Sequence, residues 1–442
     1  MLTYVEALAY LNQFISYERQ QPTKYSPETL NLDRVNALLD RLERPDRQFR
    51  AIHIAGTKGK GSTAAMIESC LRAAGYRTGL YTSPHLHTFR ERIRVGNAII
   101  SKDDFARLVT ELMPHIEAVT GITWFEIVTT LAFLHFAQSH IDVAVLEVGL
   151  GGRFDATNVI TPLVSVITPL SKVHMALLGN TLEQIAFEKA GIIKPHVPVV
   201  SAPQRSEAFE ILRRVAKFRA TTVTLVGRDV LVEPLAASLA GQDFSVQAVK
   251  LALQQFSIPL LGLHQIANAA TAITALRIAN ERGLTISDEA LRNGLANVQW
   301  PGRLEILTRE PLLVVDGAHN GDSAQKLAAA LRDVFQHDRW TLIIGVSADK
   351  DIPAIFDALL PIAQRIIVTR ARNSRAADVE VLAAKFSERD RVVEITPSVS
   401  DALDIALKDQ RPVIITGSLF IVADAREAWF KRSGLPLPER DE

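Results

Sequence analysis

Short apolar runs and helical apolar periods alternate along most of the chain, and this pattern predicts an α/β fold. Residues 51–55 form an apolar run typical of a buried strand, and after Ser62 the spacing becomes that of one helix face. Further strands are predicted over 76–81, 143–147 and 163–168. Helices are predicted over 1–16 (with Leu2, Val5, Leu8, Leu11 and Ile15 on one side), 32–42, 181–190 and 265–280.

The second part of the chain repeats a strand–helix rhythm from Leu312 to Thr416. This alternation predicts a second, smaller, mostly parallel sheet with helices. The stretch Val298-Gln-Trp-Pro-Gly-Arg303 resembles an interdomain hinge, so we divide the chain into domains 1–298 and 299–442. Residues 204–262 give a weaker pattern, with a strand-like run over 222–226.

A phosphate-binding loop is predicted in Ala51-Ile-His-Ile-Ala-Gly-Thr-Lys-Gly-Lys-Gly-Ser-Thr63. Strand, glycine turn and helix N-terminus together form an anion site, because free N–H groups and the helix dipole face the ligand. Lys60 would reach the outer phosphates, and Ser62 or Thr63 could bind Mg²⁺. The spacing differs from a Walker A motif, since Gly61 separates Lys60 from the hydroxyls. The alternative is a tight connection without a ligand, which leaves the lysine and two hydroxyls unexplained.

Composition excludes several classes of protein. The 442 residues carry 49 basic and 49 acidic side chains, so no overall basic field exists for nucleic acid or anionic lipid. The single cysteine, Cys70, excludes an internal disulfide. No apolar stretch approaches the roughly 18 residues of a membrane span, and the N-terminus is unlike a signal peptide. We expect a soluble, cytoplasmic protein.

Polar residues at predicted strand ends are further candidates for a site. Glu147 ends an apolar strand, and burying its carboxylate needs a cation, either Arg153 or a bound Mg²⁺. Asn268 lies in the first turn of a predicted helix, as a capping residue or a ligand contact. By pattern alone, His174 is more typical of a structural histidine, and Lys189 of a solvated partner for Glu188.

The motifs together resemble the folylpolyglutamate synthase and dihydrofolate synthase family of the Mur ligase superfamily. The matching stretches are 54–62, 82–86, 147–158, 178–194, Pro301-Gly-Arg303, Asp316-Gly-Ala-His-Asn320 and Thr416-Gly-Ser-Leu419. The resemblance implies an N-terminal P-loop-type ATP-binding domain with a mostly parallel sheet and a C-terminal Rossmann-like glutamate-ligase domain. It weakens in the first 25 residues and over 204–262.

The resemblance also implies roles for individual residues. ATP contacts are expected at Gly59, Lys60, Gly61, Ser62, Asn268, Arg303, Asp316 and His319. Ser83, Glu147 and His174 look like ligands for one or two Mg²⁺ ions, and Lys189 matches a lysine that the family carries as an N6-carboxylysine. Lys60, Lys189 and His174 are thus the expected catalytic residues. Contacts to the pterin part of the substrate are expected at Thr123, Trp124, Phe125, Glu126, Phe154, Asp155 and Ala156.

Two positions depart from the family pattern. Lys58 stands where bacterial members usually have Asn, which resembles eukaryotic folylpolyglutamate synthases and favours polyglutamate activity weakly. Val173 replaces the usual Asp before His174, so a partner that would orient the imidazole is missing.

The expected reaction is addition of L-glutamate to a folate or pteroate carboxylate through an acyl phosphate, by a monomer. Dihydropteroate, tetrahydrofolate or both could be the acceptor. A peptidoglycan-type Mur ligase is disfavoured, because only about 50 residues precede the loop, too few for an extra domain. A small-molecule kinase and a non-catalytic nucleotide-binding module remain as alternatives.

Overall fold

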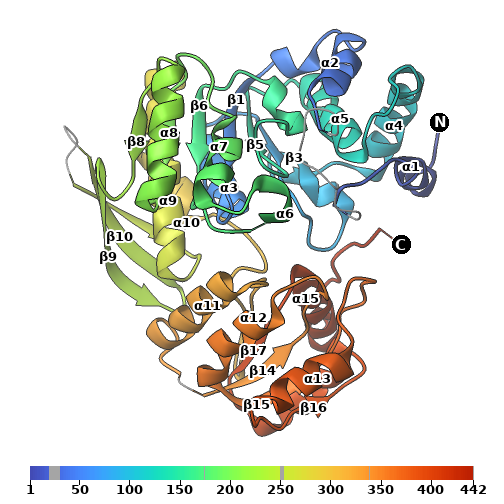
Figure 1. Ribbon diagram of the computed structural model, residues 1–442, viewed down its shortest axis with the longest axis vertical. Coiled ribbons are helices and arrows are strands. Elements are labelled where there is room, and N and C mark those ends of the chain that lie inside the picture. The colour runs from blue at the N-terminus through green and yellow to red at the C-terminus, as the bar shows by residue number, and fades with distance from the viewer. Residues whose placement is uncertain (19–29, 174, 249–252, 338, 442) are drawn as a thin grey trace.

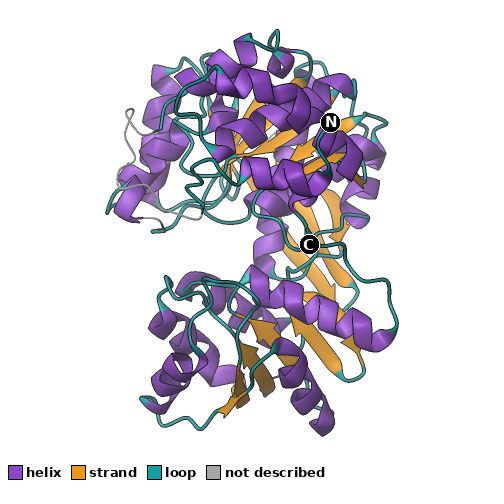
Figure 2. Ribbon diagram, turned by 90° about the vertical axis from the view of Figure 1, so that its right-hand side faces the viewer, coloured by secondary structure: helices purple, strands orange, loops and turns teal. Residues whose placement is uncertain are grey.

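The computed structural model describes residues 1–18, 30–173, 175–248, 253–337 and 339–441, which form two lobes joined by a narrow waist (Figures 1 and 2). The N-terminal lobe is built on an eight-stranded sheet. Its strands, from edge to edge, are β4 (Ala98–Ile99), β3 (Ile93–Val95), β2 (Thr78–Tyr81), β5 (Val143–Glu147), β1 (Arg50–Ala55), β6 (Val164–Ile167), β7 (Val199–Ser201) and β8 (Val223–Leu225). The six strands from β2 to β8 are parallel, and only the β3–β4 edge runs antiparallel. The mostly parallel sheet predicted from the sequence is confirmed.

Alternate side chains of β1 point to opposite faces of this sheet, as a strand requires. Ile52 and Ile54 face a core shared with α3 (Lys60–Ala73), α9 (Leu263–Glu281) and α10 (Asp288–Ala296). Ala51 faces a second core. The helices of that second core are α1 (Tyr4–Leu11), α2 (Asp33–Asp40), α4 (Lys102–Glu117) and α5 (Trp124–Gln138). Helices therefore cover both faces, so the loops at the carboxyl ends of the strands are left to form a site.

The segment that gave a weak sequence pattern contains a helix and a separate small sheet. Helix α8 (Ser206–Phe218) packs with α7 (Leu182–Ala190) on the main sheet. Strands β9 (Val230–Ser238), β10 (Gly241–Ala248) and β11 (Gln254–Ile258) then form an antiparallel three-stranded sheet. In Figure 1 this sheet descends beside α9 toward the C-terminal lobe.

The C-terminal lobe has a six-stranded sheet in the order β12 (Glu305–Arg309), β13 (Leu312–Val315), β17 (Val413–Thr416), β14 (Trp340–Ile344), β15 (Ala363–Val368) and β16 (Glu394–Ile395). Only β12 is antiparallel. One face carries α11 (Gly321–Asp333), α12 (Ile352–Leu359) and α13 (Val379–Ser387), and the other carries α14 (Val399–Ala406) and α15 (Leu419–Ser433). The smaller second α/β layer is confirmed.

The N-terminal helix differs from its prediction. A capping box of Thr3 and Glu6 starts α1, which ends at Leu11 rather than at the predicted residue 16. Tyr4, Ala7 and Leu11 are buried, whereas Val5 and Ile15 are 64% and 57% exposed. The predicted apolar face is confirmed for Leu2, Leu8 and Leu11, which pack on the core, and is wrong for Val5 and Ile15. None of the described helices has the length and apolar character needed to cross a lipid bilayer.

Candidate active site

The glycine loop between β1 and α3 has the geometry predicted from its sequence. Gly59 takes a left-handed conformation (φ +79°) as the N-cap of α3, so the helix N-terminus opens at Lys60. A Cβ on Gly59 would lie 2.4 Å from the Asn268 side-chain oxygen, and one on Gly61 would lie 2.7 Å from Trp300. Asn268 thus packs against the loop, and donates to Gln265 (3.0 Å), which in turn donates to Ser62 (3.3 Å).

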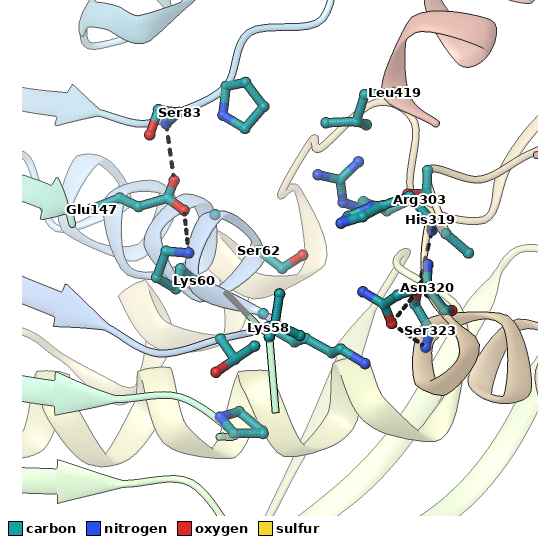
Figure 3. Close-up of a pocket in the computed structure, with 18 of the residues that line it drawn as sticks. Lys58, Lys60, Ser62, Ser83, Glu147, Arg303, His319, Asn320, Ser323 and Leu419 are labelled. Atoms are coloured by element: carbon teal, nitrogen blue, oxygen red, sulfur yellow. Dashed lines mark hydrogen bonds and ion pairs between the residues drawn. The ribbon is translucent and has the colours of Figure 1, made fainter. Parts of the chain in front are cut away.

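Glu147 and Lys60 face each other beside this loop (Figure 3). The Lys60 ammonium lies 3.6 Å from one carboxylate oxygen, and the Ser83 amide donates to the other at 3.2 Å. Burial raises the pKa of Glu147 more than Lys60 and the Ser83 amide lower it. Arg153, the other candidate partner, instead binds Glu188 (2.7 Å). A buried carboxylate that has only one amide donor and one ammonium near it can still bind a further cation.

Lys189 is buried rather than solvated, which corrects the interpretation from pattern alone. Its amine donates to the Gly56 carbonyl at 2.8 Å, at the start of the phosphate loop. Burial, with help from Lys60, lowers the pKa of Lys189 to about 7, so a large fraction of the amine is neutral near neutral pH.

The C-terminal lobe supplies the opposite wall. The Asp316 carboxylate accepts from the Leu304 and Ala318 amides, both at 2.9 Å, and burial raises its pKa. Arg303 is half-buried, and desolvation lowers the pKa of its guanidinium more than the charges of Asp316 and Glu147 raise it. The His319 ring is 2.8 Å from the Gly317 carbonyl, and burial lowers its pKa. Figure 3 shows Arg303 and His319 across the pocket from Lys60 and Glu147.

These walls enclose one cavity of about 930 Å³ between the lobes. Most of the predicted site residues line it, namely Gly59, Lys60, Gly61, Ser62, Ser83, Thr123, Phe125, Glu126, Glu147, Phe154, Asp155, Ala156, Asn268, Arg303, Asp316 and His319. Residues from both predicted domains and from six of the seven matching stretches, all except 178–194, therefore line one cavity.

Two predicted substrate contacts, Trp124 and Glu126, interact mainly with other protein side chains. Trp124 is only 6% exposed and packs against Phe89, with the Arg92 guanidinium 5.1 Å from its ring, so Phe125 is the aromatic side chain that faces the cavity. Glu126 binds Arg34 (3.0 Å) and caps its own helix through Thr123.

The hard oxygen donors around Glu147 fit Mg²⁺. The Glu147 carboxylate and the hydroxyl of Ser83, whose amide donates to Glu147, both line the cavity and are oxygen groups of the kind that this ion prefers. Among the described residues, no three His, Cys, Asp or Glu side chains cluster as a metal site. His174, the third predicted ligand, lies outside the described residues.

Several cavity residues were not predicted from the sequence. Glu18, His85, Lys326, Lys350 and Arg375 all line it. Glu18 binds Arg92 through two contacts of 2.8 Å across 74 residues, a pairing that no local pattern reveals. Lys350 follows β14, and a basic residue after a strand is the sequence signal that could have indicated it as a ligand contact.

Comparison with known proteins agrees with this geometry. Residues 54–276 match the Mur ligase middle domain, and residues 302–419 match the Mur ligase glutamate ligase domain. The dihydrofolate synthase/folylpolyglutamate synthase of Bacillus subtilis is 39% identical over 90% of this chain and 94% of its own length. The folylpolyglutamate synthase structure from Thermotoga maritima has a TM-score of 0.85 and 34% identity, covering 99% and 98% of the two chains. A structure described as an FPGS–AMPPCP–folate complex has a TM-score of 0.83 and 33% identity, covering 96% and 99%. The chain therefore belongs to the Mur ligase family, in its folylpolyglutamate synthase and dihydrofolate synthase group.

Proposed function

We propose that this chain is an ATP-dependent ligase that adds L-glutamate to the carboxylate of a folate. Residues 1–298 would bind ATP and folate, and residues 299–442 would supply the glutamate-ligase face. The similar structure with AMPPCP and folate supports both ligands for this chain. The observation that carries the proposal is the shared cavity, in which Lys60 and Glu147 face Arg303, Asp316 and His319 from the other lobe.

The first step would activate the acid. A carboxylate oxygen of the folate attacks the γ-phosphorus of ATP, forming an acyl phosphate while the bond to the β-phosphate oxygen breaks and ADP leaves. Lys60 and the amides at the start of α3 would stabilise the charge on the transferring phosphoryl group, and Arg303 would add positive charge from the other lobe.

The second step would form the amide. The amine of L-glutamate attacks the acyl carbon, the carbon–oxygen bond to phosphate breaks, and the amine loses a proton to solvent or a base. Lys350 and Arg375 line the C-terminal wall of the cavity and are suited to the carboxylates of glutamate. Closure of the lobes would exclude water, which otherwise hydrolyses an acyl phosphate.

We further propose that Ser83, Glu147 and His174 hold Mg²⁺, with Lys189 as a further ligand in its carboxylated form. When bound, Mg²⁺ supplies positive charge to the phosphate oxygens. The neutral amine favoured by the lowered pKa of Lys189 is the form that reacts with CO₂. Carboxylation would relieve the cost of burying an ammonium beside Lys60.

Folate would lie against the N-terminal wall. Phe125 offers an aromatic face, and Thr123, Phe154, Asp155 and Ala156 complete this side of the cavity. The Asp155 carboxylate already accepts from the Gly149, Leu150 and Thr157 amides, so it shapes the loop after β5 as well. We propose a monomer, since both walls of the site come from a single chain. A cytoplasmic location fits a reaction that consumes ATP.

The test is a glutamate-ligation assay with dihydropteroate, dihydrofolate and tetrahydrofolate as separate acceptors. We expect glutamate incorporation with tetrahydrofolate, and ADP release that requires glutamate. Incorporation with dihydropteroate alone would identify a dihydrofolate synthase, and incorporation with both a bifunctional enzyme. ADP release without glutamate would indicate a kinase, and ATP binding without turnover on any acceptor would indicate a non-catalytic nucleotide module.

A further inference from the structure

The C-terminal tail crosses from the C-terminal lobe to the N-terminal lobe. Helix α15 ends at Gly434 (φ +67°), and the chain then runs toward the segment before β3 (Figure 1). There the Asp441 carboxylate accepts from the Tyr4 hydroxyl at 2.5 Å, and from the Thr88 hydroxyl and the Phe89 amide. Three donors of the N-terminal lobe thus converge on one side chain of the tail.

A second tail residue pairs with a buried guanidinium. Arg90 is 4% exposed and donates to the Ile100 carbonyl at 2.9 Å, and its other terminal nitrogen pairs with Glu439. A buried guanidinium requires a compensating anion, and here the anion comes from the other lobe. The Arg440 side chain meanwhile binds Asp424 (2.8 Å) on α15, which anchors the tail to its own lobe.

The segment held by the tail is mechanically connected to the cavity. Residues 88–92 form a short 3₁₀ helix, η2 (Phe89–Arg92), capped by Thr88. The Glu91 carboxylate accepts from the Leu86, His87 and Thr88 amides at 2.8–3.1 Å, so the loop after Ser83 and this helix form one rigid unit. Arg92, the last residue of the helix, donates to the His85 ring (3.0 Å) and to Glu18 (2.8 Å).

Since Ser83, His85 and Glu18 line the cavity, a shift of the helix would displace the cavity wall. The same unit touches the C-terminal lobe at two other points. Leu86 packs against the core below α14 and α15, and the His87 ring lies 2.7 Å from the Arg426 guanidinium. Arg426 also binds Glu305 (3.0 Å), next to the hinge.

We propose that Asp441 and Glu439 are positioning residues, which fix the loop of Ser83 and His85 by clamping its far end, Thr88–Arg92, to the C-terminal lobe. The tail lies beyond residues 302–419, which match the glutamate ligase domain. The clamp makes the shape of the cavity wall formed by Ser83, His85 and Glu18 dependent on the position of the C-terminal lobe.

Amide hydrogen exchange tests the clamp in the full-length chain. Asp441→Ala removes the acceptor for three donors, and we expect exchange over residues 84–92 to become about fivefold faster or more. Asp404→Asn is the matched control, because it removes an acidic partner of Arg432 within the C-terminal lobe, away from the loop. Unchanged exchange over 84–92 in Asp441→Ala would overturn the proposal, as would a uniform rise across the N-terminal lobe, which signals general destabilisation.

A kinetic arm rests on the proposed function. Asp441→Ala and Glu439→Gln should each raise KM for ATP in the presence of Mg²⁺ about fivefold, because the displaced loop carries Ser83, a proposed Mg²⁺ ligand, while Asp404→Asn should leave this constant unchanged. An unchanged KM for ATP in both tail variants, or an equal rise in Asp404→Asn, would contradict positioning of the Ser83 loop by the tail. If the unaltered chain ligates no folate at all, the proposed function fails, while hydrogen exchange still decides whether the clamp exists.

Discussion

Glu147→Gln should separate the catalytic use of a buried carboxylate from its effect on stability. Glu147 is 4% exposed, with Lys60 at 3.6 Å and a single backbone donor, Ser83. At an effective dielectric constant of about 20, attraction over 3.6 Å is worth about 5 kcal/mol. Removing two ions from water costs several kcal/mol each, so the net contribution of the pair to the free energy of unfolding is close to zero.

The raised pKa of Glu147 shows that, in the ligand-free protein, the cost of burying its charge exceeds the attraction to Lys60. A carboxyl whose folded pKa exceeds its unfolded value favours the fold when neutral, and this stabilisation is lost as pH rises through the folded pKa. A neutral, isosteric glutamine should therefore leave the melting temperature of the ligand-free protein equal or higher. Turnover should fall by about 10²–10³, the usual loss for one electrostatic group at a reacting phosphoryl or acyl centre.

Glu68→Gln is the matched control. Glu68 is 5% exposed on α3, but it binds Thr78 (2.6 Å) and Arg72 (3.3 Å) and does not line the cavity. Its substitution should lower the melting temperature and leave turnover per folded molecule unchanged. Differential scanning fluorimetry and the ligation assay measure both quantities. A lower melting temperature for Glu147→Gln together with near-normal turnover would refute the reasoning.

Three further substitutions test other parts of the site. Gly61→Ala places a Cβ 2.7 Å from Trp300, and the overpacking should cost about 1–3 kcal/mol. ADP binding, measured by calorimetry, should therefore weaken about tenfold. An unchanged affinity would contradict the close approach. Asp316→Asn keeps one acceptor oxygen for two amide donors, and should raise KM for ATP about tenfold; an unchanged constant would remove Asp316 from the nucleotide side. When bicarbonate is added to CO₂-depleted enzyme, the recovered activity should be about tenfold higher at pH 8 than at pH 6, at equal concentrations of dissolved CO₂. The reason is that a pKa of about 7 leaves the Lys189 amine mostly neutral only above that pH. Lys189→Arg should abolish this response, and a response that survives would exclude carboxylation of Lys189.

The sequence predicted those parts of the molecule that depend on local pattern. The glycine loop at 56–61, the helix over 181–190 and the strand–helix rhythm after Leu312 each follow from a few adjacent residues, and the structure confirms these elements. The small sheet of β9, β10 and β11 was missed because its first strand is largely exposed and carries no clear alternation.

Side-chain partners were harder to predict, since they depend on tertiary packing. Glu147 pairs with Lys60 rather than Arg153, and Lys189 is buried although its neighbour Glu188 is paired near the surface. Trp124 turned into the core while Phe125 faces the cavity, a choice set by the packing of Phe89 and Arg92. The clamp by Asp441 joins residues more than 350 positions apart, beyond the reach of any local signal.

The central claim is that the cavity between the lobes converts an acid into an acyl phosphate before glutamate attacks. A folate acceptor labelled with ¹⁸O in its reacting carboxylate tests this claim most directly. The account predicts that one ¹⁸O atom per turnover appears in inorganic phosphate, because the attacking oxygen leaves with the phosphoryl group. Unlabelled phosphate, with glutamate incorporated at the normal rate, would contradict it.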